Sequence, residues 1–228
     1  MSLQIIGTSH IAKQSVNEIK KAIQENKPDI VAIELDIGRA AALLQKQRNR
    51  ISLAEIFQIG VKGYLFAKIG QYVQQKLGKS VGITPGSDMK IAMELARKNK
   101  LDVAFIDQPI KITLSNFSKS LTWKEKGRFF LDIFKGLLFP RKQMKKLGLD
   151  KFDLSKVPAD ELIKKMMGQL KERYPSIYKT LVEDRNKYMV QKLVGLMRDK
   201  PGKKILAVVG AGHKEGMEKL LLKVDVVR

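Results

Sequence analysis

The chain contains no cysteine, which excludes disulfide bonds, thiolate metal sites and cysteine nucleophiles. This absence fits a reducing compartment. Histidine and tryptophan are also scarce, with two and one among 228 residues. Acidic residues number 23 against 44 lysines and arginines, which gives a net charge of +21. That excess favours a polyanionic partner, either an anionic membrane surface or nucleic acid.

Several sequence patterns with known chemistry are missing as well. There is no Gly-x4-Gly-Lys-Ser/Thr loop, no Gly-x-Ser-x-Gly elbow, no Gly-x-Gly-x-x-Gly turn and no His-Glu-x-x-His helix. P-loop, dinucleotide-binding, serine-hydrolase and zincin chemistry therefore lack support. No apolar run reaches the roughly 18 residues that a membrane-spanning helix requires.

Apolar runs that read as buried strands alternate with helical patterns. The runs are residues 3–6, 30–33, 101–106 and 205–209. This alternation predicts an α/β fold with a mostly parallel central sheet and flanking helices. We expect one domain over residues 1–228 with a helical insertion at 111–175, and a long helix at 176–198.

Three local predictions refine this outline. Ser15 and Glu18 form a Ser-x-x-Glu capping box, which predicts a helix that runs from there to about Asn26. Residues 52–79 predict one or two packed helices. Residues 224–227 predict a last strand.

Both histidines follow an apolar strand and precede a helical pattern. His10 ends Gly7-Thr8-Ser9-His10, and His213 ends Gly210-Ala211-Gly212-His213. Because the carboxyl ends of parallel strands are the usual ligand-binding edge of such a sheet, we expect both imidazoles there. Taken singly, each is better explained as a turn histidine beside glycines needed for backbone geometry, but the use of both histidines in the same context favours a shared site.

Carboxylates stand at two further strand ends. Glu34 follows residues 30–33, and Asp107 follows residues 101–106. Glu34 either works in a site or forms a buried ion pair with Arg39, and an arginine can also orient a working carboxylate. The segment Glu183–Asn186, which contains Arg185, is either a polar patch facing the site or a solvated helix face.

Two imidazoles and one or two carboxylates form the ligand set of a hydrolytic metal site. We expect His10, Glu34, His213 and Asp107 to hold a divalent ion such as manganese, cobalt or zinc. Helix N-termini beside the histidines disfavour a bare cation, so the metal hypothesis depends on Glu34. Without a metal, the same residues suit general acid–base chemistry.

A basic amphipathic segment extends from Trp123 to Leu147. Its apolar residues alternate with lysines and arginines, and a second basic group follows Pro140. Such a segment can lie on an anionic membrane surface. Alternatively its apolar face packs in the core and its lysines are solvated. Nucleic acid is the less favoured partner because no nucleic-acid-binding fold motif is present.

Six short motifs follow one another along the chain. They are Gly7-Thr8-Ser9-His10, residues 31–36 with Arg39, residues 84–89, residues 106–110 with Thr113 and Leu114, residues 184–189, and residues 208–213 with Gly216. This ordered set resembles the TraB/PrgY (pheromone-shutdown) family, which is related to the Tiki proteins and more distantly to ChaN-like and erythromycin-esterase-like proteins. The resemblance covers nearly the whole chain. Asp88, Gln108 and Asn186 depart from the family pattern, which has Glu, Arg and Asp there.

The resemblance implies the α/β fold of those families and a metal-dependent site of peptidase type. His10, Glu34 and His213 would hold or activate the ion, while Arg39 and Arg185 would orient carboxylates or a peptide substrate. Many archaeal members continue into C-terminal membrane helices. If the native chain does the same, the resemblance implies a location on the cytoplasmic side of a membrane. The rival hypothesis is a non-catalytic module that sequesters a peptide or binds a membrane through its basic face.

Overall fold

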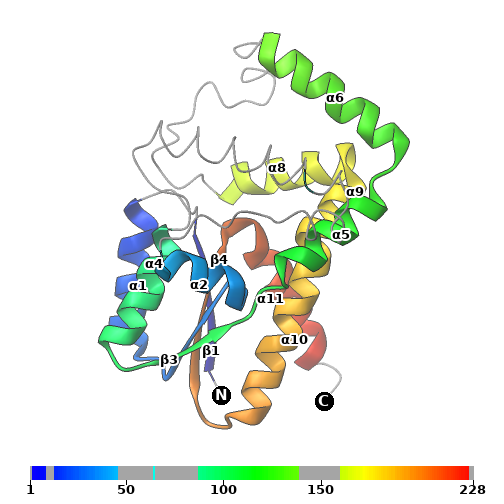
Figure 1. The fold of residues 1–228 in the computed structure, drawn as a ribbon. Helices are drawn as coiled ribbons and strands as arrows, with labels where there is room; N and C mark the ends of the chain where they lie inside the picture. Colours follow the sequence, from blue (N-terminus) through cyan, green and yellow to red (C-terminus); the bar gives the residue numbers. More distant parts are fainter. Residues whose placement is uncertain (1, 9–12, 46–63, 65–86, 139–159, 226–228) are drawn as a thin grey trace.

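A single parallel sheet organises the part of the chain that the structure describes. The computed structural model describes residues 2–8, 13–45, 64, 87–138 and 160–225 (Figure 1). Within these residues four strands pair in the order β1-β4-β2-β3, and every pairing is parallel. The strands are β1 (Ser2–Thr8), β2 (Ile30–Ile33), β3 (Asp102–Phe105) and β4 (Lys204–Gly210). The predicted α/β class and its parallel sheet are confirmed.

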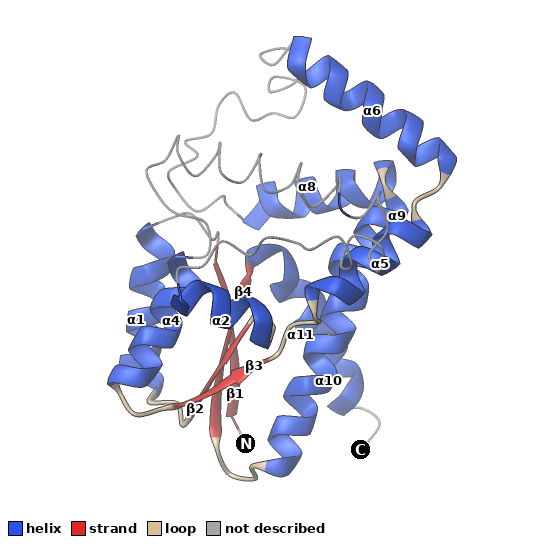
Figure 2. Ribbon diagram, in the orientation of Figure 1, coloured by secondary structure: helices blue, strands red, loops and turns tan. Residues whose placement is uncertain are grey.

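Helices cover both faces of the sheet (Figure 2). Alternate strand residues divide between two cores, since successive side chains point to opposite faces. Val31, Ile33 and Val208 pack with helices α1 (Lys13–Asn26), α2 (Ile37–Gln45) and α4 (Ser87–Lys98). Ile30, Ala32 and Val209 pack with α10 (Asp184–Asp199) and α11 (Ala211–Asp225) on the other face. The result is a three-layer sandwich whose middle strands, β4 and β2, are buried except for Lys204.

A second group of helices stands beyond the carboxyl ends of the strands (Figure 1). It comprises α5 (Ile110–Ser120), α6 (Trp123–Leu138), α8 (Asp160–Arg173) and α9 (Pro175–Tyr178). The described residues of the expected insertion at 111–175 are thus helical, apart from Leu121, Thr122 and Tyr174, and contain no strand. Its status as an insertion within one domain stays a prediction.

The long helix predicted at 176–198 is present but is not uniformly α-helical. A π-helical turn, η1 (Lys179–Glu183), joins α9 to α10. After α10 the chain turns at Gly202, whose φ of 80° lies in the left-handed region that glycine adopts without strain. The turn leads directly into β4.

Two local predictions were wrong. Ser15 lies inside α1, which already includes Lys13, so the Ser-x-x-Glu pattern is not the helix cap. The expected last strand at 224–227 is helix as far as Asp225, because α11 continues to that residue. The helices predicted within 52–79 lie outside the described residues, except for Tyr64, which is helical. None of the helices in the described ranges is both long and apolar enough to cross a bilayer.

Candidate functional site

The carboxyl ends of the strands carry a cluster of buried polar side chains. Thr8 ends β1 and is aligned with Gly210 at the end of β4. Beyond β2, the Glu34 amide still donates to the Val208 carbonyl at 3.0 Å, which holds Glu34 beside β4. Beyond β3, the Asp107 amide likewise donates to the Leu35 carbonyl, which holds Asp107 beside the end of β2. Strand pairing therefore gathers the candidate residues at one edge of the sheet.

Glu34 is buried and both its carboxylate oxygens are engaged. Oε2 accepts the Gly210 amide at 2.5 Å. Oε1 accepts a hydrogen bond from Arg185 Nη2 and lies 3.3 Å from His213 Nε2. One oxygen is thus fixed by backbone, while the other faces the arginine and the imidazole.

Arg185 projects from α10 and binds both strand-end carboxylates. Its Nε lies 3.0 Å from Asp107 Oδ1 and its Nη2 lies 2.7 Å from Asp107 Oδ2. Burial alone would lower the pKa of Arg185, but attraction to Glu34 and hydrogen bonding to Asp107 outweigh it and raise that pKa. The guanidinium is therefore a permanent positive charge between two buried carboxylates.

Arg39 joins the cluster by binding Asp36 and Asp107, whereas the sequence had suggested a pair with Glu34. Its Nε donates to Asp36 Oδ2 at 2.7 Å, and its Nη2 donates to Asp107. Among the described residues the arginine bound to Glu34 is Arg185, so the alternative of a Glu34–Arg39 ion pair is wrong.

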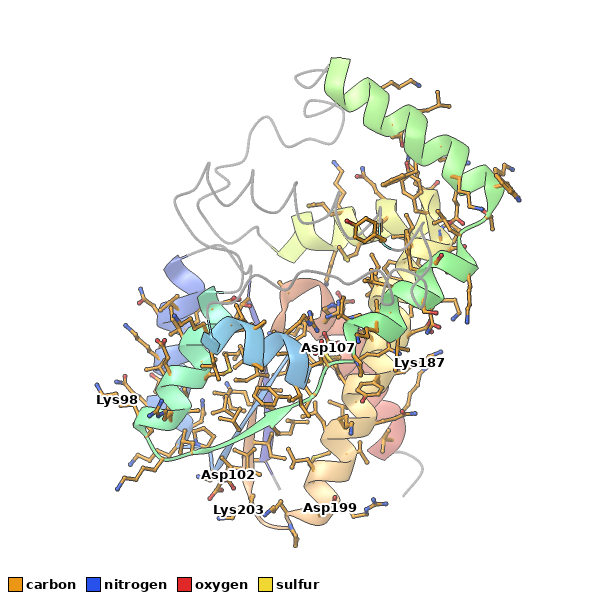
Figure 3. All side chains as sticks on the ribbon, in the orientation of Figure 1. Lys98, Asp102, Asp107, Lys187, Asp199 and Lys203 are labelled. Carbon is orange, nitrogen blue, oxygen red and sulfur yellow. The ribbon has the colours of Figure 1, made fainter. Side chains whose placement is uncertain are left out.

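Asp36 anchors Arg39 at the start of α2. Burial opposes its ionisation, but hydrogen bonds from Arg39 and from the Ile110 amide keep the pKa of Asp36 below its ordinary value of 3.8. Figure 3 shows Asp107 near the end of the sheet where these groups meet, with Asp102 and Lys203 toward the opposite end.

His213 lies in the first turn of α11, and not ahead of the helix as the sequence suggested. Its Nδ1 is 2.6 Å from Asn186 Oδ1, and its Nε2 is 3.0 Å from Arg185 Nη1. Because an amide oxygen only accepts, Nδ1 carries the proton and Nε2 accepts from the arginine. His213 is therefore a neutral imidazole whose lone pair faces the cluster.

Two backbone features bring α10 and α11 into this arrangement. The π-helical turn ends at Glu183, two residues before Arg185, and the Leu181 carbonyl within it accepts from Arg185 Nη1 at 3.2 Å. Such turns often occur at functional sites because they redirect side chains. On α11, a Cβ added at Gly216 would overlap the Asn186 side-chain nitrogen. Glycine at this position lets Asn186 approach His213.

The donors that the structure describes fit a divalent ion only in part. In the described ranges no three histidine, aspartate or glutamate side chains converge as a metal site. Glu34 Oε1 and His213 Nε2 lie 3.3 Å apart, a separation that suits two ligands about 2.0–2.2 Å from one ion. Arg185 contacts both atoms and would have to move for an ion to bind between them. Asp107 fits less well than either, because two arginines, Arg39 and Arg185, bind its carboxylate. His10 lies outside the described residues.

A second buried pair lies at the same edge. Thr8 donates to Asp88 at 2.5 Å, and Asp88 also accepts the Met89 amide at the start of α4. Both side chains are about 1% exposed. This pair joins the end of β1 to α4, so position 88, one of the three departures from the family pattern, is built into the core.

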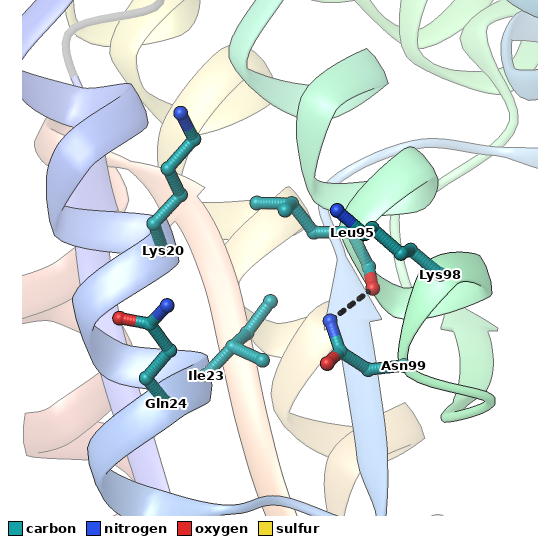
Figure 4. A pocket seen from close by; sticks show the side chains of 6 residues that line it. All are labelled: Lys20, Ile23, Gln24, Leu95, Lys98 and Asn99. Atoms are coloured by element: carbon teal, nitrogen blue, oxygen red, sulfur yellow. Dashed lines mark hydrogen bonds between the residues drawn. The ribbon is translucent and has the colours of Figure 1, made fainter.

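A surface pocket of about 310 Å³ lies elsewhere, between α1 and α4 (Figure 4). Its lining residues are Lys20, Ile23, Gln24, Leu95, Lys98 and Asn99. None of them is a carboxylate or an imidazole, and Asn99 already donates to the Leu95 carbonyl. The pocket is separate from the cluster at the strand ends.

Five of the six predicted site residues come together here: Glu34, Arg39, Asp107, Arg185 and His213. Their catalytic or metal-binding roles stay predictions. Asn186 and Asp36 were not predicted as site residues, although each had a signal. Asn186 follows Arg185 in the polar segment of the long helix, and Asp36 stands two residues after Glu34.

The fold and this cluster define an α/β protein with a buried carboxylate–arginine–histidine site at the strand ends. The sequence model of the TraB/PrgY/gumN family matches residues 2–224. An uncharacterized protein of Methanocaldococcus jannaschii is 35% identical over 232 residues, which cover 98% of this chain and 54% of that protein. TraB domain-containing proteins of Homo sapiens and Mus musculus are 25% and 24% identical over 243 residues, which cover 94% of this chain and 61% of each relative.

The chain therefore belongs to the TraB/PrgY/gumN family, as its motifs predicted. It spans less than two thirds of the length of these relatives.

Proposed function

We propose that the chain is a metal-dependent hydrolase of peptidase type, with Glu34 and His213 as two of the ligands of a divalent ion. The observation that carries this proposal is the geometry of that pair. Glu34 Oε1 and His213 Nε2 lie 3.3 Å apart, while the far atom of each group is fixed by a neighbour. Gly210 holds Glu34 Oε2 and Asn186 holds His213 Nδ1.

This support by neighbours is characteristic of metal ligands. A ligating histidine usually donates its other ring N–H to an oxygen acceptor, which fixes the tautomer and the direction of the lone pair. Asn186 serves that purpose for His213. His10, from the matching motif after β1, is the proposed third ligand. An ion held by these residues would supply a water of lowered pKa and would polarise a carbonyl.

The two arginines have supporting roles in this proposal. Arg185 bonds Glu34, Asp107 and His213. Its positive charge repels a metal ion at the same place unless the negative charge of the surrounding ligands exceeds the charge of Arg185. Asp107 also binds Arg185 and is itself bound by Arg39, so the charge of Arg185 is shared between Asp107 and Glu34. A peptide carbonyl or carboxylate is the substrate group that these arginines would orient.

Metal content measured by mass spectrometry tests the proposal. The protein is stripped and then reloaded with manganese, cobalt and zinc in turn. We expect near-stoichiometric uptake of one ion, and its loss in Glu34→Gln and His213→Ala. Asp107→Asn and Asp199→Asn should retain it, since the first is bound by arginines and the second is exposed at the end of α10.

Circular dichroism of each variant shows whether lost uptake reflects lost fold. In the folded wild-type protein, uptake of none of the three ions would refute the proposal. If metal binds, the loaded protein is incubated with a mixture of unstructured peptides, and cleavage is followed by mass spectrometry. Tight peptide binding without cleavage would instead establish a peptide-sequestering module.

A further inference from the structure

One face of α6 contacts residues 173–176 through side chains. Glu125 is buried and accepts the Ser176 amide at 2.8 Å. One turn further along, Phe129 packs edge-on against Tyr174 with ring centroids 6.1 Å apart. Asp132 then receives two hydrogen bonds from Arg173, at 2.6 and 2.5 Å. These contacts fix the rotation of the helix about its axis.

The opposite face of α6 carries large apolar side chains in solvent. Trp123 is 82% exposed and Leu131 is 58% exposed. Residues 125, 129 and 132 share one face of the helix, because residues three or four apart lie on the same side. Positions 123 and 131 are not at this spacing from them and lie on the other side. Lys124 and Lys135 are exposed beside them, and Lys126 Nζ lies 4.0 Å above the Trp123 ring. We call Trp123, Lys124, Leu131 and Lys135 the outer face of α6.

We propose that the outer face of α6 docks on an anionic phospholipid membrane. Tryptophan prefers the boundary between headgroups and acyl chains, and leucine gains by entering the hydrocarbon. The lysines beside them suit anionic headgroups, which attract a protein of net charge +21. The attached face keeps this apolar surface pointed outward.

The location of α6 suits this role. It is the described element that stands farthest from the sheet, beyond the carboxyl ends of the strands (Figure 1). A membrane bound at α6 would therefore lie on the same side of the molecule as the site. The inference does not depend on hydrolase activity, since the residues that carry it are separate from Glu34 and His213.

The chain contains a single tryptophan, so its fluorescence reports on Trp123 alone. We expect vesicles of mixed phosphatidylglycerol and phosphatidylcholine to shift the emission to shorter wavelength. Lipids brominated on their acyl chains should quench it. Vesicles of phosphatidylcholine alone should have little effect, and added salt should weaken the response to anionic vesicles. Unchanged emission with anionic vesicles at low salt would overturn the proposal.

Matched variants test whether vesicle binding depends on the outer face of α6 or only on the net positive charge of the protein. Leu131→Ser should weaken co-sedimentation with anionic vesicles by roughly tenfold, since one buried apolar side chain is lost. Leu222→Ser on α11 serves as the control because Leu222 is 66% exposed. Equal loss in both variants would contradict docking through α6. A fluorescence shift with single-stranded DNA but not with vesicles would replace the membrane with nucleic acid as the partner.

Discussion

Asn186 Oδ1 lies 2.6 Å from His213 Nδ1, and this contact determines which nitrogen of the imidazole carries the proton. The amide oxygen can only accept, so the proton is on Nδ1 and the Nε2 lone pair faces Arg185 and Glu34. We predict the Nδ1–H tautomer for His213 in metal-free protein. Nitrogen-15 NMR of the ring distinguishes the tautomers, and His10→Ala assigns the signals because the chain has only two histidines. A proton on Nε2 would contradict this arrangement.

Arg185 contributes a large share of the stability of the strand-end cluster. Arg185→Met would leave Glu34 and Asp107 without their shared positive charge, and both carboxylates are at most 5% exposed. Removing one partner of a buried ion pair costs about 3–5 kcal/mol of unfolding free energy. Urea denaturation measures this loss.

Lys179→Met is the matched control for that substitution. Lys179 is 60% exposed and pairs with Asp184 at 2.9 Å, a surface contact worth about 0–1 kcal/mol. A loss in Arg185→Met no greater than in Lys179→Met would show that Glu34 and Asp107 are stabilised by other groups.

The strands and their end residues could be predicted from the sequence because each signal is local. Residues 30–33 are apolar throughout and follow a turn, which is typical of a buried parallel strand. Glu34 and Asp107 directly follow such runs, and parallel pairing then brings them to one edge. The family resemblance also rested on local motifs at these strand ends.

The resemblance named Arg185 as a residue that orients carboxylates, but which carboxylate each arginine binds could not be predicted, because the pairing is set by helices far away in the sequence. Arg185 reaches Glu34 across 151 positions, and nothing near Glu34 signals this contact. Arg39 stood five residues from Glu34 and was the obvious partner, but Asp36 and Asp107 hold it. The π-helical turn before Arg185 has no recognisable pattern in the sequence.

Tyr174 provides a pH-dependent report on the attachment of α6. Burial and the hydrogen bond to Asp132 raise the pKa of Tyr174 from 10.0 to about 12. Between these values the folded state binds more protons than the unfolded state, so the free energy of unfolding falls as pH rises. Tyrosinate absorbance should show a step near pH 12, and Tyr174→Phe should remove that step. An absorbance titration that is the same with and without Tyr174→Phe above pH 11 would contradict the contact with Asp132.

Gly216 allows the contact between α10 and α11, and replacing it tests how His213 is held. A Cβ at position 216 would overlap the Asn186 side chain, so Gly216→Ala must displace Asn186. We expect a loss of about 1–3 kcal/mol of unfolding free energy from this overpacking, and a change in the ring nitrogen signals of His213.

Gly195→Ala is the control, because Gly195 lies within α10 and a Cβ there meets nothing within 4 Å. Alanine is the better helix former by about 1 kcal/mol, so this variant should be neutral or more stable. If Gly216→Ala matched Gly195→Ala in stability and left the His213 signals unchanged, close packing of Asn186 against α11 could not be what orients the imidazole.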